Sequence, residues 1–236
     1  MSDKHLSTQF DSDLNAVSAR VMEMAGLVES QTRGAIDALS RFNDEAADRV
    51  IEAEERVNAM EIVIDRELTS IIGRRQPTAR DLRLLMAISR ITANLERAGD
   101  EANKIARMVK SIIVSGTARS LPARELNLAV DTAAALLRKS LDAFARLDTH
   151  LAIEILKEDD VIDREFGGFM RKLVTYMMED PRTISASLDL LFVAKAIERI
   201  GDHAKNIAES VIYIVKGADV RHSSMEEIES AVASKF

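Results

Sequence analysis

Apolar residues recur at every third or fourth position along most of this chain, which is the spacing of one buried face of an α-helix. One such stripe consists of Ile91, Leu95, Ala98, Ala102, Ile105, Val109 and Ile112. Charged and polar residues occupy the positions between them, so the stripe predicts a long amphipathic helix. Several such helices, connected by short turns, are typical of a helical bundle.

Turn residues and capping signals interrupt this pattern and divide each half of the chain into three helices. The first three are predicted at about Phe10–Arg41, Asn43–Ile72 and Thr78–Val114. Asn43 or Asp44 is the expected N-terminal cap of the second helix. Gly73 and Gly116 are expected at the C-terminal ends of the second and third helices, because glycine readily adopts the left-handed conformation found there.

The second half repeats this arrangement. Pro122, Asp148 and the pair Asp180-Pro181 mark the predicted starts of helices four, five and six, and Gly217 marks the end of the sixth. Ser224-Met-Glu-Glu is a capping box that predicts a short final helix. The predicted fold class is therefore all-α: two tandem homologous three-helix bundles, with six long antiparallel helices, plus a short C-terminal helix.

The chain contains an internal duplication. The segments Leu95-Glu-Arg-Ala-Gly-Asp-Glu-Ala-Asn-Lys-Ile-Ala106 and Ile197-Glu-Arg-Ile-Gly-Asp-His-Ala-Lys-Asn-Ile-Ala208 are identical at seven of twelve positions, 102 residues apart. Two earlier stretches of each half also match, at an offset of 105. A duplication of this length predicts two domains, 1–118 and 119–236, of which the second carries the C-terminal tail.

Composition narrows the class of protein. The 236 residues are 47% hydrophobic and 30% charged, with few glycines and prolines, as expected of a globular helical protein. The chain has no cysteine and no apolar stretch approaching the ~20 residues of a membrane span, so we expect a cytoplasmic protein. The net charge of −7, without a long basic run, argues against nucleic acid as the main partner.

The repeated element Glu-Arg-x-Gly-Asp identifies candidate metal ligands. It places Glu96 with Asp100, and Glu198 with Asp202, four residues apart on one helix face. The second and fifth helices carry similar pairs, and antiparallel packing would bring two pairs together in each half. The complete candidate set is Glu54, Asn58, Glu96, Asp100, Asp159, Asp163, Glu198 and Asp202. Such oxygen donors suit Mg, Mn, Fe or Ca.

A solvated charged face is the alternative explanation for these carboxylates. Two features favour a site: like charges four apart destabilise a helix, and Gly99 and Gly201 are unfavourable inside one. The glycines are interpreted as open space beside the carboxylates, with close helix packing as the competing explanation. Because Asn58 is neutral, the charge count predicts stronger metal binding in the second half. Glu61 and Asp65 extend the first-half face, whereas Phe166 and Met170 stand at their second-half positions.

The sequence lacks the usual signatures of catalysis. It contains no phosphate-binding loop, no Gly-x-Ser-x-Gly elbow and no Glu-x-x-His pair of the kind that forms di-iron cores. The leading hypothesis is a non-enzymatic signalling adaptor. A surface-metal-dependent hydrolase or oxidase is the alternative, and a purely structural helical scaffold is a third.

The acidic pairs, set in a duplicated three-helix chain of this length, resemble those of the PhoU family of phosphate-uptake regulators. The resemblance covers residues from about Phe10 to Lys216, and Asn58 departs from the family pattern. It implies a cytoplasmic homodimer that acts as a negative regulator. The implied partners are a phosphate ABC transporter ATPase and a sensor histidine kinase, with only peripheral association with the membrane. It also implies a divalent or multinuclear metal, such as Mg, Mn, Fe or Zn, held by the acidic motifs.

Overall fold

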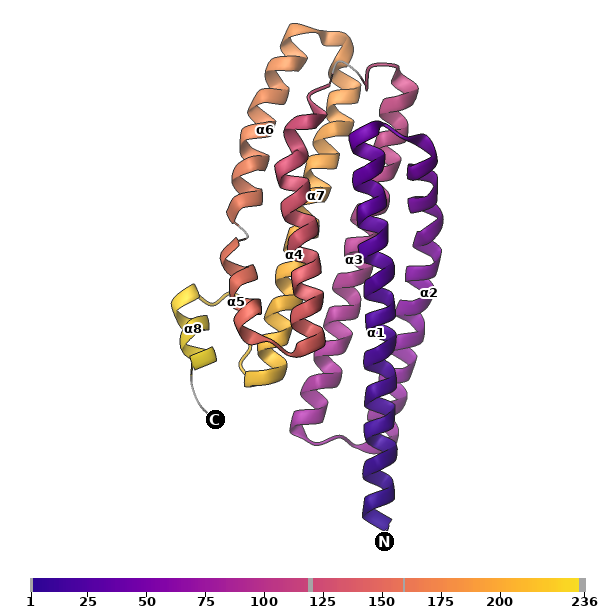
Figure 1. Cartoon of the computed structure of the whole chain (residues 1–236), viewed down its shortest axis with the longest axis vertical. Coiled ribbons are helices and arrows are strands. Elements are labelled where there is room, and N and C mark those ends of the chain that lie inside the picture. The colour runs from indigo at the N-terminus through magenta and orange to yellow at the C-terminus, as the bar shows by residue number, and fades with distance from the viewer. Residues whose placement is uncertain (1, 119–120, 159, 234–236) are drawn as a thin grey trace.

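The computed structural model describes residues 2–118, 121–158 and 160–233, with the side chains of 2–9, 160 and 161 left out. This part of the chain is helical and has no strand, so the predicted all-α class is confirmed. The described residues form eight α-helices: α1 Ser2–Arg41, α2 Asp44–Arg75, α3 Ala79–Ser115, α4 Asn127–Arg146, α5 Thr149–Glu158, α6 Asp160–Glu179, α7 Ile184–Lys216 and α8 Met225–Ala233 (Figure 1). In Figure 1, α5 and α6 lie end to end in the place of the predicted fifth helix.

The predicted caps agree with the structure at most helix ends. The side chain of Asn43 accepts a hydrogen bond from the N–H of Ala46 at the start of α2. Gly116 and Gly217 end α3 and α7 in the left-handed conformation, with φ of 71° and 67°. The capping box before α8 is formed by Ser224 and Glu227, each of which accepts from the other's N–H.

Four helix ends differ from the predictions, and the first is the start of α1, which lies at Ser2 and not near Phe10. Helix α2 continues past Gly73 to Arg75, and Gln76 takes the left-handed capping position with φ of 47°. The last turn is held in place because Arg75 forms an ion pair with Asp13 of α1, at 3.0 Å. Pro122 and Pro181 do not begin α-helices directly. They lead into short 3-10 turns, Ala123–Leu126 and Pro181–Thr183, that precede α4 and α7.

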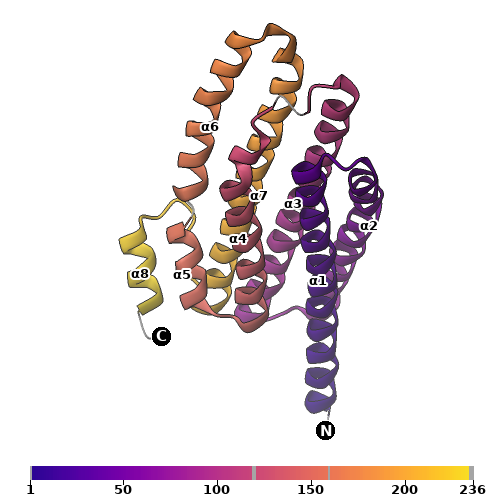
Figure 2. The same ribbon diagram turned by 45° about the horizontal axis from the view of Figure 1, so that its top comes forward.

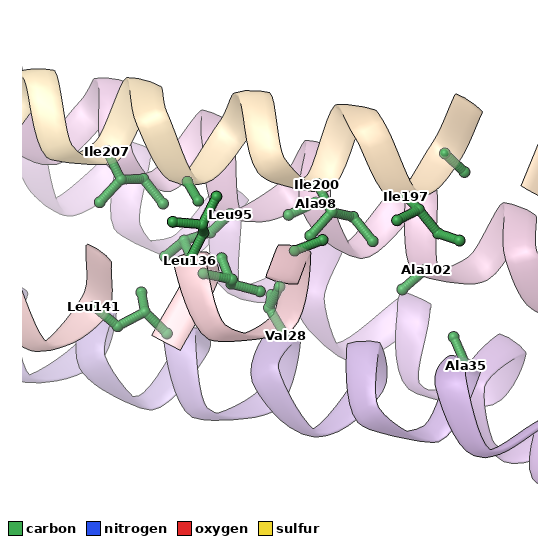
Figure 3. Close-up of a cluster of buried hydrophobic side chains, with 14 of the residues drawn as sticks. Val28, Ala35, Leu95, Ala98, Ala102, Leu136, Leu141, Ile197, Ile200 and Ile207 are labelled. Carbon is green, nitrogen blue, oxygen red and sulfur yellow. The ribbon is translucent and has the colours of Figure 1, made fainter. Parts of the chain in front are cut away.

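Helices α3 and α7 form the centre of the molecule and make the most extensive contact between any two elements. Figures 1 and 2 show α1 and α2 on one side of this pair and α4, α5 and α6 on the other. Helix α8 packs against α5 and α7. The core is continuous across the two halves, and Figure 3 shows Val28 of α1, Ala98 and Ala102 of α3, Leu136 of α4 and Ile200 of α7 within it. Small side chains on α3 allow close approach of α7.

Candidate functional site

Helices α2 and α3 bring the first-half candidate residues together, as the antiparallel arrangement predicts. Burial and the neighbouring charges of Asp100 and Glu61, with a smaller effect of Glu54, raise the pKa of Glu96 to about 7. Burial and the charge of Glu101 also raise the pKa of Asp100. Carboxylates on two helices are therefore close enough to oppose each other's ionisation. We call Glu54, Asn58, Glu61, Glu96 and Asp100 the first-half acidic cluster.

Two polar residues of α3 complete this cluster and were missed in the sequence. Asn103 donates a hydrogen bond from Nδ2 to Oε2 of Glu54, and Nη2 of Arg107 lies 3.7 Å from the same oxygen. Both follow Asp100 at helical spacings of three and seven, so they share its face. This helical spacing is the feature of the sequence from which Asn103 and Arg107 could have been predicted as members of the cluster. On α2, the Oδ1 atom of Asn58 is buried without a hydrogen-bond partner among the described residues.

The second half is arranged differently. Asp159 lies outside the described residues, and Asp163 and Asp202 are exposed on α6 and α7. Glu198 forms an ion pair through Oε2 with Lys195, one helical turn earlier on α7. The Nζ atom of Lys195 also lies over the ring of Phe166, 5.4 Å from its centroid. A cation and an aromatic ring therefore stand beside Glu198, whereas the first half has Ala93 and Glu61 at the equivalent positions.

The interpretation of the repeated glycines as open space was wrong. A Cβ atom on Gly201 would lie 2.6 Å from Cδ1 of Ile162, and one on Gly99 would lie 3.0 Å from Oε1 of Gln31 and 3.5 Å from Cγ1 of Val57. Val57 and Ile162 occupy equivalent positions in the duplication. Glycine therefore allows close packing in both halves, of α3 against Gln31 of α1 and of α7 against Ile162 of α6.

The carboxylates form pairs and a loose cluster rather than a closed set of ligands. Within the described ranges, no three His, Asp or Glu side chains are grouped so that they could hold a metal ion. An ion would need to draw the first-half oxygens closer together. Their chemistry is suited to that task, because closely spaced carboxylates with raised pKa values are stabilised by a hard cation.

A polar contact between the two halves lies next to the repeated motifs. Arg199 donates from Nη1 to Oε1 of Glu101, and Asn94 accepts from Nδ2 of Asn206 through Oδ1, both at 3.1 Å. Nδ1 of His203 lies at the same distance from that Asn94 oxygen. Burial, together with Arg97 and Arg199, lowers the pKa of His203 to about 4. The imidazole of His203 is therefore neutral at neutral pH and only partly exposed.

A cavity of about 940 Å³ opens between α5, α7 and the segment before α8. Asp202 and His203 line it together with several cationic side chains, including Lys157, Arg199 and Arg221. These cations already have acidic partners: Glu229, Glu101 and Asp219, respectively. The cavity is therefore polar, and its charges are largely satisfied.

In the described part of the chain, no helix is both long and apolar enough to cross a membrane.

Comparison with known proteins places this architecture in a family. Residues 21–109 and 126–211 each match the PhoU domain. The chain is 51% identical over 229 residues to a phosphate-specific transport system accessory protein PhoU homolog of Burkholderia sp, covering 97% of both chains. It is 45% identical over 240 residues to the PhoU accessory protein of Escherichia coli K12, covering 98% of this chain and 95% of the relative.

Solved structures agree with this result. The crystal structure of PhoU from Pseudomonas aeruginosa matches with a TM-score of 0.83 and 41% identity, over 89% of this chain and 100% of that one. PhoU from Streptococcus pneumoniae matches with a TM-score of 0.80 and 24% identity, over 89% of this chain and 98% of that one. At 24% identity this second match shows the fold alone.

Proposed function

Because this chain belongs to the PhoU family, whose members are regulatory and accessory proteins and not enzymes, we propose that it restrains phosphate uptake and phosphate-starvation signalling. In this role it is a cytoplasmic adaptor between a phosphate ABC transporter ATPase and a membrane sensor histidine kinase. It associates with the membrane only through these partners, and it works as a homodimer.

One observation carries this proposal. The chain matches accessory proteins of phosphate-specific transport systems along almost its whole length, and both halves of the duplication match the same domain. A relative with the same two repeats along the same length is expected to present similar surfaces to its partners. The adaptor role also agrees with the exposure of Asp100 and Asp202, because these side chains lie on the outside of the bundle, where a partner protein can contact them.

The test is genetic and biochemical. The gene is deleted in its host, and a phosphate-starvation reporter is measured in high phosphate, with and without the wild-type gene restored. We expect the deletion to turn the reporter on and the restored gene to silence it. Purified protein is also expected to retain the transporter ATPase and the kinase from solubilised membranes. A reporter that stays silent in the deletion strain would overturn the proposal.

We also propose that the acidic clusters bind a hard divalent cation. In the first half the donors fit: Glu54, Glu96 and Asp100 supply charged oxygens, and the unpartnered Oδ1 of Asn58 supplies a neutral one. Such an ion would supply positive charge and draw α2 and α3 together at this face. In the second half, Asp163, Glu198 and Asp202 are the described candidates, and Asp159 completes the proposed set.

Metal binding has a direct measurement. Protein purified without chelators is analysed for bound Mg, Mn, Fe and Zn, and the metal-free protein is titrated with Mn²⁺ by calorimetry. We expect binding that is lost in the double variant Glu96→Gln/Asp100→Asn. Failure to bind any of these ions would reject the metal proposal and leave the regulatory proposal standing.

A further inference from the structure

A second cavity, of about 580 Å³, lies at the end of the molecule farthest from the α3–α4 connection. The start of α3, the end of α7 and the turn between α4 and α5 form it, and all three lie at the lower end of Figures 1 and 2. Its polar lining consists of Arg80, Asp81, Arg83 and Lys216. This cavity is separate from the first-half acidic cluster and from the larger cavity beside α8.

The two arginines lack acidic partners. The structure gives neither Arg80 nor Arg83 an ion pair or a side-chain hydrogen bond within the described residues, and the Nε atom of Arg83 is buried without a partner. The nearby carboxylate of Asp81 accepts a hydrogen bond from Oγ1 of Thr78 at 2.9 Å. Cations in the larger cavity are paired, so the unpaired state of Arg80 and Arg83 distinguishes this one. A buried guanidinium nitrogen without a partner is costly unless a ligand satisfies it.

Helix dipoles account for the position of Arg83 but not for that of Arg80. Arg83 lies against the end of α7: a Cβ atom on Gly217 would be 3.3 Å from its Cζ. A cation there is stabilised by the negative end of the α7 dipole. Arg80, by contrast, lies in the first turn of α3, where the dipole disfavours a positive charge. Arg80 is exposed to solvent, so the buried Nε of Arg83 is the group that helix stability leaves without a partner.

The rest of the cavity is apolar. Leu84, Leu147, Ile214 and Val215 line it, and Leu147 and Val215 are partly exposed. The volume lies within the range of small-molecule sites and far exceeds what one inorganic oxyanion would fill. A fork of guanidinium donors suits a phosphate, which has the oxygen spacing to accept two parallel hydrogen bonds. The apolar wall suits an organic group attached to that phosphate.

We propose that this cavity binds a phosphate monoester whose organic part is flat or apolar. In this arrangement Arg80 and Arg83 hold the phosphate, and the organic group packs on Leu84, Ile214 and Val215. The inference goes beyond the regulatory role proposed above, since it assigns a small-molecule site to a surface formed by both halves of the duplication.

Calorimetric titration of the full chain tests this assignment. The probes are inorganic phosphate, phenyl phosphate, AMP and glucose 6-phosphate at constant ionic strength, with phenol and adenosine as uncharged controls. We expect phenyl phosphate or AMP to bind more tightly than inorganic phosphate and glucose 6-phosphate, and the uncharged compounds not to bind. Whichever of phenyl phosphate and AMP binds more tightly identifies the ligand as a simple aryl ester or a nucleotide.

Four variants locate the site. Arg83→Gln is expected to weaken the preferred ester by about tenfold or more, because a charge-assisted hydrogen bond is lost. Arg49→Gln, which removes an exposed arginine of α2 that lines none of these cavities, is expected to leave binding unchanged. Leu147→Asp should weaken binding relative to Leu147→Asn, since the two differ only in charge and both tolerate the left-handed backbone at this position (φ 52°).

Two results would overturn the proposal. The first is no binding of any ester at millimolar concentration by folded wild-type protein, or equal binding of inorganic phosphate and the esters. The second is unchanged ester affinity in Arg83→Gln and Leu147→Asp, with only the stability of Arg83→Gln reduced. That second outcome would assign Arg83 to the end of α7 alone.

Discussion

Arg199 of α7 donates a hydrogen bond to Glu101 of α3 across the contact between the two halves of the duplication, with Nη1 and Oε1 3.1 Å apart. Glu101 is only 8% exposed. The duplication relates Arg199 to Arg97 and Glu101 to His203. The equivalent arginine, Arg97, therefore faces a histidine and lowers its pKa. The arginine of the second repeat, Arg199, thus forms an ion pair with Glu101. Its counterpart in the first repeat, Arg97, instead disfavours protonation of His203.

Removing this ion pair is expected to weaken the contact between the halves. We expect Glu101→Gln to lower the free energy of unfolding by about 1–2 kcal/mol, because Arg199 remains partly solvated and the pair is only half-buried. Denaturant titration measures the change, and a double-mutant cycle with Arg199→Gln isolates the pairwise coupling. Arg41→Gln, which removes a surface pair with Asp37 within α1, is the control and should cost less than about 0.5 kcal/mol. Equal losses in the two variants would contradict the prediction.

Close packing at Gly201 has a measurable consequence. The side chain of leucine would collide with Ile162, so Gly201→Leu is expected to be destabilised by about 1–3 kcal/mol despite its better helix propensity. Gly26 of α1 is the matched control, because it is exposed and a Cβ atom there would meet no other atom within 4 Å. Gly26→Ala should therefore stabilise the protein by up to about 1 kcal/mol. Thermal unfolding of both variants decides the point. A stable Gly201→Leu protein would restore the open-space interpretation.

The raised pKa of Glu96 predicts how stability depends on pH in metal-free protein. Folding raises this pKa from 4.5 to about 7, so the native state binds the proton more tightly than the unfolded state. The stability that this group contributes is therefore fully present below about pH 4.5 and is lost as the pH rises towards 7. Glu96→Gln removes this term. With chelator present, we expect the variant to gain stability relative to wild type between pH 4.5 and pH 7, as measured by denaturant titration.

If Glu96→Gln shows no relative gain, burial and the neighbouring carboxylates do not raise the pKa of Glu96 as expected. Asp37→Asn, which removes a half-exposed carboxylate paired with Arg41, is the control and should show no such gain.

The ion pair of Lys195 with Glu198 changes the expected order of metal affinity. Counting charges along the sequence predicts stronger binding in the second half. In the structure, however, Lys195 pairs directly with Glu198 there, whereas in the first half Arg107 lies 3.7 Å from Glu54 and Arg97 acts on Glu96 through its charge. We therefore expect Asp100→Asn to reduce Mn²⁺ binding more than Asp202→Asn. Lys195→Gln should increase affinity at the second half, because a competing cation is removed. Calorimetric titration of the three variants checks this, and a greater loss in Asp202→Asn would support the charge count.

Features that depend on local spacing could be predicted from the sequence. The apolar stripes, the cap at Asn43, the terminal glycines Gly116 and Gly217 and the capping box at Ser224 all follow from interactions within a few residues. The duplication predicted which helices are equivalent, and the antiparallel order brought Glu54 and Glu96 onto one face. The Lys195–Glu198 pair was also available, since it spans one helical turn.

Only the tertiary structure decided what these local features contact. Gly99 and Gly201 were equally consistent with open space and with close packing until Gln31 and Ile162 were placed against them. The bond from Arg199 to Glu101 joins residues 98 apart in sequence, and the cavity of Arg80 and Arg83 is formed by chain segments from both halves. Helical periodicity determines which face a side chain occupies. The partner across that face depends on how the helices cross, which is set by the packing of the whole core.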